Sequence, residues 1–487
     1  VGGLMPLILP GNVASATAGA YEIANSCRFN LGDSPQLSKS VGSSATTKYT
    51  LSLWVKRADI GTAAGQRFLT STGGSGLGDT YFRFNPSNIM EVSGHGSNAA
   101  GGGYLVTNRV FEDPSAWYHI VVRYDSTEST ANDRFRLYIN GVDERTVGGY
   151  SSSTMPNSDV ADNITADGNT LRIGATTSLQ YCGMYMAEIH FSEGQSYAPT
   201  EFGEYDEDSP TIWKPKKASI SYGTSGFYLD FEDSANLGND ANGGTDLSET
   251  NIAAIDQCTD TPTNSFCTLN PLDNYYQEAT FSEGNCKVVT EGSSAVYAFV
   301  TGTIGLTAGK WYFEMKMTNS TGGGGSFYGV AAELATSAST ELGQTANQIG
   351  FLNNDTTRTS NTATAFGDGD YTTDDIMMCA LDMTNSRIFF GKNGVWMTPS
   401  AGSGGDPTDG TGNVALPTAV ASTPIGAYLP AFGAYMNAAQ TMEPNFGNPS
   451  FTISSGNADA NGYGNFEYAV PSGYLAICTK NLGSDGG

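Results

Sequence analysis

The sequence is poor in charged residues, and basic residues are the scarcer kind. Only 15% of the 487 residues are charged, and 23 Lys and Arg stand against 49 Asp and Glu, which gives a formal net charge of −26. An average soluble protein has about 25% charged residues. Because this acidic excess repels phosphate backbones and anionic lipid headgroups, we expect no nucleic-acid binding and no membrane binding.

The sequence also lacks long apolar runs. No stretch approaches the roughly 18–20 consecutive apolar residues that a membrane-spanning helix needs, so we expect no membrane insertion. Residues 1–11 (VGGLMPLILPG) hold a short apolar run with two prolines and no basic flank, unlike a signal peptide. We interpret residues 1–20 as an N-terminal anchoring arm that docks on a partner.

Cysteines and histidines are few and do not form metal-binding patterns. The seven cysteines are an odd number without a C-x-x-C pair, and none of the three histidines lies at metal-ligand spacing from another. We expect most cysteines to be small buried hydrophobic residues. The spacing of Cys258, Cys267 and Cys286 leaves one disulfide open. His119 lies in a core-type strand, which favours a structural role.

Short alternating windows and turn residues are abundant. Residues 50–56 (TLSLWVK) and 117–124 (WYHIVVRY) alternate between apolar and polar side chains, and 61 glycines separate such windows. Asn140-Gly141 and Asn393-Gly394 supply the two left-handed positions of a type I′ hairpin turn. Almost no segment has helical periodicity over more than about ten residues. The pattern predicts an all-β protein with two tandem antiparallel β-sandwich (jelly-roll) domains.

The repetition of this pattern divides the chain. Residues 310–317 (KWYFEMKM) and 387–396 (RIFFGKNGVW) repeat the alternation and the hairpin of the first half. Between the halves lies a stretch rich in Asn, Asp, Gly and Thr with little alternation, which is typical of turns. The predicted parts are a first sandwich over 21–232, a turn-rich connector over 233–276 and a second sandwich over 277–487.

The second half resembles a SPRY domain. Five segments occur in the order of that family: 309–314 (GKWYFE), 328–331 (YGVA), 375–396 (DIMMCALDMTNSRIFFGKNGVW), 428–432 (YLPAF) and 444–447 (PNFG). SPRY domains are bent β-sandwiches that usually bind protein partners through loops, and the resemblance implies the same here. An insert at 400–412 and an extended loop over 353–373 depart from the family.

The first half is similar to laminin-G-like, concanavalin A-like jelly rolls. The segments that carry the similarity are 26–30 (SCRFN), 50–56 (TLSLWVK), 116–120 (AWYHI), 137–141 (LYING) and 185–191 (YMAEIHF). Such modules bind carbohydrate or protein surfaces and sometimes Ca²⁺. The similarity therefore implies a binding module.

A third resemblance is to virion proteins of tailed bacteriophages. It lies in 187–195 (AEIHFSEGQ), 202–207 (FGEYDE), 213–217 (WKPKK), 226–231 (GFYLDF), 260–272 (DTPTNSFCTLNPL) and 473–482 (GYLAICTKNL). The resemblance implies a tail fibre, spike or capsid decoration protein on the virion surface. It also implies a homo-oligomer that contacts other virion proteins through the arm and meets a host-surface glycan or protein.

One segment resembles a catalytic motif. Residues 188–193 (EIHFSE) are similar to the E-x-D-x-x-E strand of laminarinase-type glucanases, whose retaining mechanism needs two carboxyls about 5–5.5 Å apart. Here His190 replaces the middle Asp, and regular alternation places Ala187, Ile189 and Phe191 on one face without indicating the bulge that could bring two carboxyls together. No G-x-S-x-G nucleophile motif occurs either. We therefore expect no catalytic residues and no enzymatic activity.

Candidate ligand-binding residues lie where sandwiches usually bind. Sandwich loops carry binding sites more often than their cores do. We select Tyr81 and Tyr104 in the first domain and Asn353, Asp355 and Tyr371 in the second. No cofactor is expected, but the acidic loops 204–208 and 367–370 could supply oxygen ligands to structural Ca²⁺.

Three functional hypotheses follow from these patterns. The leading one is a phage virion protein that displays lectin-like domains for host-surface attachment or particle assembly. The alternative is a secreted bacterial adhesin that binds carbohydrate. A polysaccharide-degrading enzyme is the third.

Overall fold

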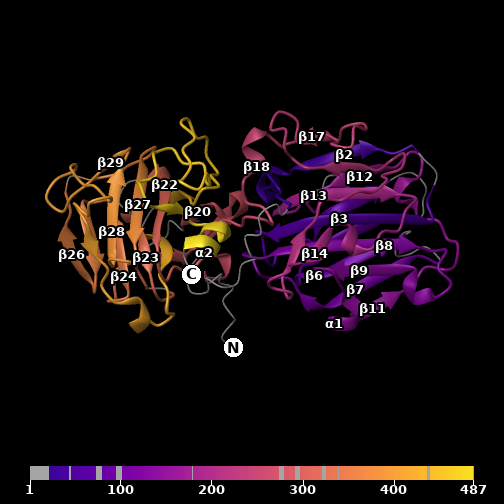
Figure 1. Ribbon diagram of the computed structural model, residues 1–487, viewed down its shortest axis with the longest axis horizontal. Helices are drawn as coiled ribbons and strands as arrows, with labels where there is room; N and C mark the ends of the chain where they lie inside the picture. The colour runs from indigo at the N-terminus through magenta and orange to yellow at the C-terminus, as the bar shows by residue number, and fades with distance from the viewer. Residues whose placement is uncertain are drawn as a thin grey trace. The chain divides into compact units, whose positions relative to one another are not determined.

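The computed structural model describes residues 21–42, 45–72, 79–94, 101–177, 179–273, 279–290, 297–320, 325–337, 339–367, 369–435 and 439–485. This part of the chain is built almost entirely of antiparallel sheets and divides into two compact units, one ending at Thr263 and one beginning at Asn264 (Figure 1). The all-β prediction is confirmed. The predicted anchoring arm, residues 1–20, lies outside the described residues.

Two large sheets form the N-terminal unit, and each is named for one central strand. The β3 sheet has the order β10 (Val142–Asp143), β9 (Phe135–Ile139), β8 (Trp117–Asp125), β3 (Lys48–Arg57), β13 (Met184–Glu193), β1 (Ser26–Phe29) and β18 (Gln257–Cys258), with β16 (Phe227–Leu229) beside β13. The β5 sheet has the order β11 (Tyr150–Thr154), β7 (Gly103–Val110), β6 (Ile89–Gly94), β5 (Thr80–Phe84), β4 (Gln66–Thr72), β12 (Thr170–Ile173), β2 (Gln36–Ser40) and β17 (Ser248–Thr250). The ribbon of β14 (Gly203–Tyr205) and β15 (Trp213–Pro215) and the one-turn helix α1 (Glu144–Val147) complete the unit.

The core of this unit lies between the two sheets. Alternate residues of β3 (Leu51, Leu53 and Val55) meet alternate residues of β5 (Phe82 and Phe84) there, and all five are fully buried. Burial of one such side chain contributes about 1.5–3 kcal/mol. The predicted hairpin turn between β9 and β10 is also present, with both central residues at positive φ.

Strand β13 departs from the predicted regular alternation. It contains a β-bulge, because the pairing with β3 shifts by one residue between Ala187 and His190, and Glu188 has a φ of 49°. Ile189 and Phe191 remain in the core, whereas Ala187 packs on the opposite face. The expectation that Ala187 shares a face with Ile189 and Phe191 is therefore wrong, since the extra residue reverses the side-chain direction.

The segment 233–276, predicted as a connector, is divided between the two units. In its first part, β17 pairs with β2 and β18 pairs with β1. The carboxylate of Asp260 then meets the ammonium of Lys56 at 2.7 Å, and both side chains are buried. From Cys267 onward the chain enters the core of the C-terminal unit.

The C-terminal unit is a second sandwich. The β22 sheet has the order β19 (Ala279–Ser282), β20 (Lys287–Thr290), β32 (Gln440–Asn445), β22 (Lys310–Ser320), β27 (Ile376–Asp382), β28 (Arg387–Lys392) and β29 (Val395–Trp396), with β30 (Val414–Ala415) beside β28 and β33 (Leu475–Ala476) beside β22. The β23 sheet has the order β21 (Tyr297–Thr301), β31 (Leu429–Tyr435), β23 (Gly325–Ala331), β24 (Gln348–Leu352), β25 (Thr356–Thr359) and β26 (Thr362–Ala365). Helix α2 (Thr479–Asp485) lies near the end of the chain. No helix in the described part of the chain is long and apolar enough to cross a membrane.

The stretch 353–373, predicted as an extended loop, contains a hairpin. Strands β25 and β26 pair through a two-residue turn in which Ser360 and Asn361 have φ values of 49° and 58°. The threonine-rich composition of both strands suits β-structure, because β-branched side chains favour extended backbone. The prediction of a loop is therefore wrong over residues 356–365.

All seven cysteines are buried thiols. The expected role as small hydrophobic residues is confirmed, and the disulfide left open for Cys258, Cys267 and Cys286 does not form.

Candidate ligand-binding face

Each of the four large sheets has one face in a core and one outer face. Apolar side chains from loops cover three of the outer faces. On the β3 sheet the covering residues are Tyr21, Ile23, Tyr197, Phe202, Trp213, Ala218 and Ile220. On the β22 sheet they include Phe466 and Tyr474, and on the β23 sheet Leu342. The outer face of the β5 sheet carries no such apolar cluster among the described residues.

The covered face of the β3 sheet is closed around His119. Its Nδ1 accepts a hydrogen bond from Trp213 Nε1 at 3.0 Å, so Nε2 carries the proton and donates to the hydroxyl of Ser52 at 2.8 Å. The ring stacks on Trp54. Complete burial lowers the pKa of His119 to about 3, which keeps it neutral. The structural role expected for this histidine is confirmed.

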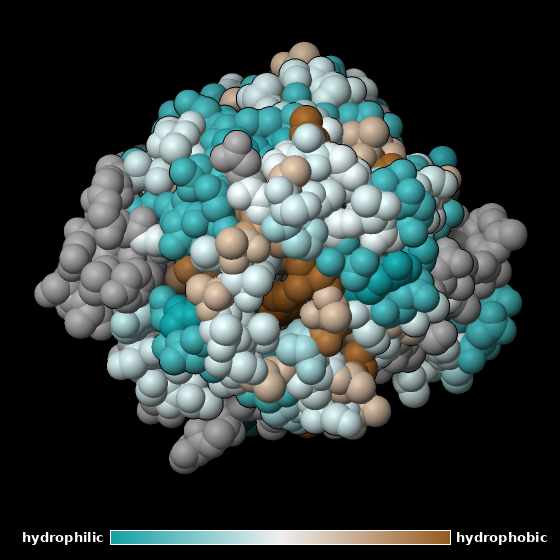
Figure 2. All heavy atoms as spheres, turned by 90° about the vertical axis from the view of Figure 1, so that its left-hand side faces the viewer, coloured by the Kyte–Doolittle hydropathy of each residue, from teal (hydrophilic) through white to brown (hydrophobic). Residues whose placement is uncertain are grey.

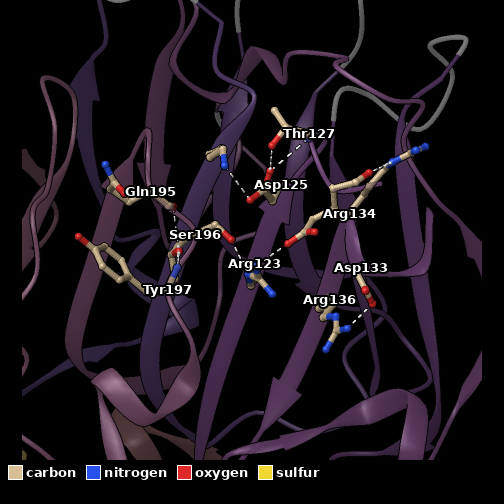
Figure 3. A network of polar contacts seen from close by, with 12 residues as sticks. Arg123, Asp125, Thr127, Asp133, Arg134, Arg136, Gln195, Ser196 and Tyr197 are labelled. Carbon is tan, nitrogen blue, oxygen red and sulfur yellow. Dashed lines mark hydrogen bonds and ion pairs between the residues drawn. The ribbon is translucent and has the colours of Figure 1, made fainter. Parts of the chain in front are cut away.

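Polar contacts hold the covering loop against the same sheet (Figure 3). Arg123 on β8 donates from Nε to the hydroxyl of Ser196. Thr50 on β3 donates to the carbonyl oxygen of Gln195 at 3.1 Å and accepts from the amide of Tyr197 at 2.8 Å. These bonds occupy the polar groups of strand and loop alike, so this face is a structural layer.

The bulge on β13 places Glu188 in a closed cluster. Its carboxylate accepts hydrogen bonds from the hydroxyls of Tyr228 at 2.7 Å and Tyr21 at 2.9 Å, and His190 Nε2 lies 3.4 Å away. Burial and then the nearby Glu188 charge raise the pKa of both tyrosines, so they stay protonated donors. Glu193 accepts from the amide of Ser225 at 2.8 Å. The bulge that the sequence did not indicate is present, but the Glu188 carboxylate is fully engaged.

A single row of side chains crosses the uncovered outer face of the β5 sheet. Strand pairing aligns Arg172 on β12, Thr70 on β4, Tyr81 on β5, Ser93 on β6 and Tyr104 on β7. Their chain neighbours Leu171, Leu69, Phe82, Val92 and Leu105 point into the core. We call this row and the adjacent Arg67, Arg83 and Glu91 the open face. It brings together Tyr81 and Tyr104, two of the five predicted binding residues.

Two guanidinium groups flank the Tyr81 ring. The carbon at the centre of the Arg67 guanidinium lies 4.4 Å from the ring centroid, and that of Arg83 lies 5.2 Å away. Tyr104 makes a side-chain hydrogen bond with Tyr81. Burial, with a smaller contribution from Glu91, raises the pKa of Tyr104 to about 12. The open face thus presents the neutral phenol of Tyr104 beside fixed positive charges.

Two hydroxyls at the centre of the open face lack partners. The side chains of Thr70 and Ser93 are fully buried, and neither hydroxyl has a hydrogen-bond partner among the described residues. A buried polar group without a partner costs about 1–3 kcal/mol. Because both hydroxyls are buried, they mark a local cost in stability and do not by themselves form a contact surface for a ligand.

The candidate residues in the C-terminal unit do not form a comparable site. Tyr371 lies in the core, where its hydroxyl donates to the carbonyl oxygen of Ser326 at 2.7 Å. Its selection as a surface ligand-binding residue is wrong, because the ring packs between Tyr328 and Phe351 instead of projecting from a loop. Asn353 and Asp355 are half-buried in the turn between β24 and β25.

The acidic loops considered for Ca²⁺ make internal contacts. In the loop 204–208, Asp206 is buried, accepts from the amides of Asp208 and Ser209, and lies 3.5 Å from the ammonium of Lys214. No group of three or more His, Cys, Asp or Glu is placed to hold a metal within the described ranges. Structural Ca²⁺ therefore stays a prediction.

The sequence patterns did not single out the arginines of the open face as binding residues. Arg67 and Arg83 each stand beside apolar core residues in strand-like windows, which is a pattern that the sequence shows. Arg172, however, reaches Thr70 through the pairing of β12 with β4, about a hundred positions apart in the chain. No local pattern predicts that pairing.

The surface of the C-terminal unit offers little apolar area in the view of Figure 2. Its apolar groups there form small areas among hydrophilic and neutral ones, the most prominent in a hollow near the centre of the view. A broad apolar docking face is not visible on this side of the described residues.

Fold and site together define a lectin-like β-sandwich followed by a second sandwich. Residues 31–190 match the family described as the concanavalin A-like lectin/glucanases superfamily, and residues 310–449 match the SPRY domain. The chain thus carries a concanavalin A-like domain followed by a SPRY domain, as both resemblances implied. No match was found among curated proteins.

Several solved structures are similar to parts of the chain. Stonustoxin shares 18% identity over 37% of this chain and 27% of its own, with a TM-score of 0.26, so the chain spans about a quarter of that protein. The SPRY domain of human HERC1 shares 15% over 36% of this chain and 96% of its own, with a TM-score of 0.27. A candidate carbohydrate-binding protein from Bacteroides ovatus shares 13% over 47% of this chain and 59% of its own, with a TM-score of 0.33.

Proposed function

We propose that this protein is a non-enzymatic component of a tailed-bacteriophage virion and that the open face of its concanavalin A-like domain binds a glycan. The observation that carries the binding role is the uncovered outer face of the β5 sheet. It combines two phenols and three guanidinium groups in one sheet surface. The other three outer faces are covered by apolar residues.

The chemistry of this face suits a saccharide. Aromatic rings offer apolar surface to sugar C–H groups, and hydroxyl and guanidinium groups exchange hydrogen bonds with sugar hydroxyls. The row from Arg172 to Tyr104 crosses five strands, or about 19 Å at a strand spacing of about 4.8 Å. Several linked sugar rings fit along that distance.

The virion role rests on the phage-like segments, on the acidic composition and on the lack of a catalytic motif in the sequence. In this role the chain is a fibre, spike or decoration protein, assembled as a homo-oligomer and attached to other virion proteins through residues 1–20. Repeated copies would make individually weak glycan contacts effective, because each further contact is intramolecular once the first has formed. No cofactor takes part.

Binding is tested on the full-length chain with a glycan array, followed by titration calorimetry of the best binder. We expect Tyr104→Ala to weaken binding at least tenfold, which is about 1.4 kcal/mol. The matched control is Tyr205→Ala, which removes a 45% exposed tyrosine of the same unit outside the open face. Equal loss in both variants, or no binding by the wild type, would contradict the proposal.

Location is tested separately by imaging intact particles with an antibody against this chain. Label at the tail tip supports a receptor-binding fibre, and label over the head supports a decoration protein. Particles without the chain would remove the virion role and favour the secreted adhesin, while leaving the glycan-binding role to the titration.

A further inference from the structure

The open face carries positive charge in a chain that is otherwise strongly acidic. Three arginines lie on it, Arg67, Arg83 and Arg172, and two carboxylates lie beside them, Asp79 and Glu91. The whole chain has a net charge of −26. The excess of guanidinium groups on this one face is therefore a local feature.

The three guanidinium groups differ in how far they are neutralised. Arg83 is paired with Glu91 by Nε at 2.7 Å and by a terminal nitrogen at 2.6 Å. Arg67 lies 3.4 Å from the carboxylate of Asp79, which is 43% exposed. The Nε of Arg67 is buried without a hydrogen-bond partner among the described residues.

Arg172 has no carboxylate within ion-pair distance in the described part of the chain. Its guanidinium donates to the hydroxyl of Thr72 at 2.6 Å and to the carbonyl oxygen of Thr170 at 3.4 Å, both from one nitrogen. A guanidinium has five N–H donors and is always charged. Partial burial makes this charge unfavourable, and Asp79 offsets the cost from beyond ion-pair distance, so an anion in direct contact with the guanidinium would be stabilising.

Arg172 lies at one end of the row. It is paired in register with Thr70, and Ser93 follows two strands further along the same row. A saccharide laid along the row would meet the Arg172 guanidinium at one end, the Tyr81 ring with its two neighbouring guanidinium groups in the middle, and the Tyr104 ring at the other end. Guanidinium groups bind carboxylates and sulfates in a fork geometry that a neutral hydroxyl cannot match.

We infer that the open face takes an anionic glycan, whose carboxylate or sulfate groups are bound by Arg172 and Arg67. The inference rests on the proposed glycan-binding function and narrows it to acidic polysaccharides. Attraction over long distances is opposed by the net charge, but salt screens this repulsion beyond about 8 Å at physiological ionic strength, so the local contacts dominate.

The test uses two matched probe pairs with the full-length chain. Oligogalacturonate is compared with the same oligosaccharide after reduction of its carboxyls, and dextran sulfate is compared with dextran. We expect one acidic member to bind at least tenfold more tightly than its neutral partner. Arg172→Gln should abolish this preference and Arg172→Lys should retain part of it.

The test has one control variant and two outcomes that would contradict the inference. Arg136→Gln changes a partly exposed arginine on β9 of the other sheet and should leave the preference unchanged. Equal binding of acidic and neutral members, weakened by Tyr104→Ala, would overturn the anionic inference and leave the glycan-binding function intact. Absence of binding to all four probes by the wild type would overturn the inference, and absence from a wider glycan array would overturn the function as well.

Discussion

The two outer faces of the N-terminal unit are built from the same kind of strand but differ in what lies on them. On the β3 sheet, residues outside the two large sheets, such as Phe202 and Trp213, form a third layer, and polar groups such as His119 are paired inside it. On the β5 sheet no apolar layer covers the described strands, and the hydroxyls of Thr70 and Ser93 are unpartnered.

The difference shows that an apolar covering layer and internal pairing separate structural polar groups from available ones. A histidine, a carboxylate and two tyrosines near the bulge resemble a catalytic cluster in sequence, yet every one of them is held by a neighbour. The open face contains no residue with obvious reactivity. Its polar side chains retain hydrogen-bonding and ion-pairing capacity that a ligand can use.

The largest loss of stability is expected on breaking the buried ion pair of Lys56 and Asp260 on the covered face. Asp260→Ala leaves the buried ammonium of Lys56 without its partner and removes the acceptor of Trp117 Nε1, so we expect a loss of about 3–5 kcal/mol of stability in the N-terminal unit. Hydrogen exchange of β3 peptides measures the opening free energy of this unit. As a control, Asp374→Asn removes the charge from a pair with Lys316 in which the carboxylate is 79% exposed, and it should cost the C-terminal unit less than about 1 kcal/mol. A loss from Asp260→Ala as small as in the control would contradict the role of the pair.

The two units should respond to pH with opposite sign through two buried groups. Burial lowers the pKa of His119 to about 3, below the ordinary value of about 6.5. Burial raises the pKa of Asp273 to about 7, above the ordinary value of about 3.9. As pH falls from 6.5 toward 3, the unfolded N-terminal unit takes up a proton that the folded one does not, so His119 makes stability fall. As pH rises from 3.9 toward 7, the unfolded C-terminal unit loses a proton that the folded one keeps, so Asp273 makes stability fall.

These slopes are measured by hydrogen exchange in each unit across pH 4–8. Compared with the wild type, His119→Gln should flatten the acid-side decline of the N-terminal unit, and Asp273→Asn should flatten the decline of the C-terminal unit toward pH 7. Each contribution is at most about 1.4 kcal/mol per pH unit. If stability changed with pH in the same way in wild type and variant, the substituted group would have the same pKa in the folded and unfolded states, which would contradict the prediction.

Removal of a serine hydroxyl should have opposite effects on the two faces. Ser93→Ala on the open face removes a buried hydroxyl without a partner, so stability should rise by up to about 1 kcal/mol. Ser52→Ala on the covered face removes the partner of His119 Nε2, so stability should fall by about 1–3 kcal/mol. Thermal unfolding of the two variants measures both, and a fall in the Ser93→Ala variant would indicate that the hydroxyl has a structural partner.

The smallest effect is expected for Glu188→Gln, which tests the hypothesis that the protein is an enzyme. Glu188→Gln keeps the size of the side chain and can still accept from Tyr21 or Tyr228, so the expected loss is about 1 kcal/mol of stability. Glycan hydrolysis, followed by reducing-end release, should be absent from wild type and variant alike. Hydrolysis by the wild type that disappears in Glu188→Gln would establish the enzyme instead.

The sequence predicted the fold class and part of the open face. Alternation with Phe82 and Leu105 directs Tyr81 and Tyr104 away from the core, and Asn140-Gly141 defines one hairpin by its turn chemistry. The bulge at Glu188 was not predicted, because the positive φ of a non-glycine residue depends on its tertiary contacts. The position of Arg172 depends on the register of strands far apart in the sequence. The burial of Tyr371 depends on its packing against Tyr328 on β23 and Phe351 on β24, which are distant in the sequence.

The most direct test of the central claim is hydrogen exchange of the full-length chain with and without a saturating glycan identified on the array. Binding at the open face predicts slower exchange in β4, β5, β6, β7 and β12, with the covered face and the C-terminal unit unchanged. Protection confined to the loops of the C-terminal unit, or to residues 195–222 over the β3 sheet, would contradict it.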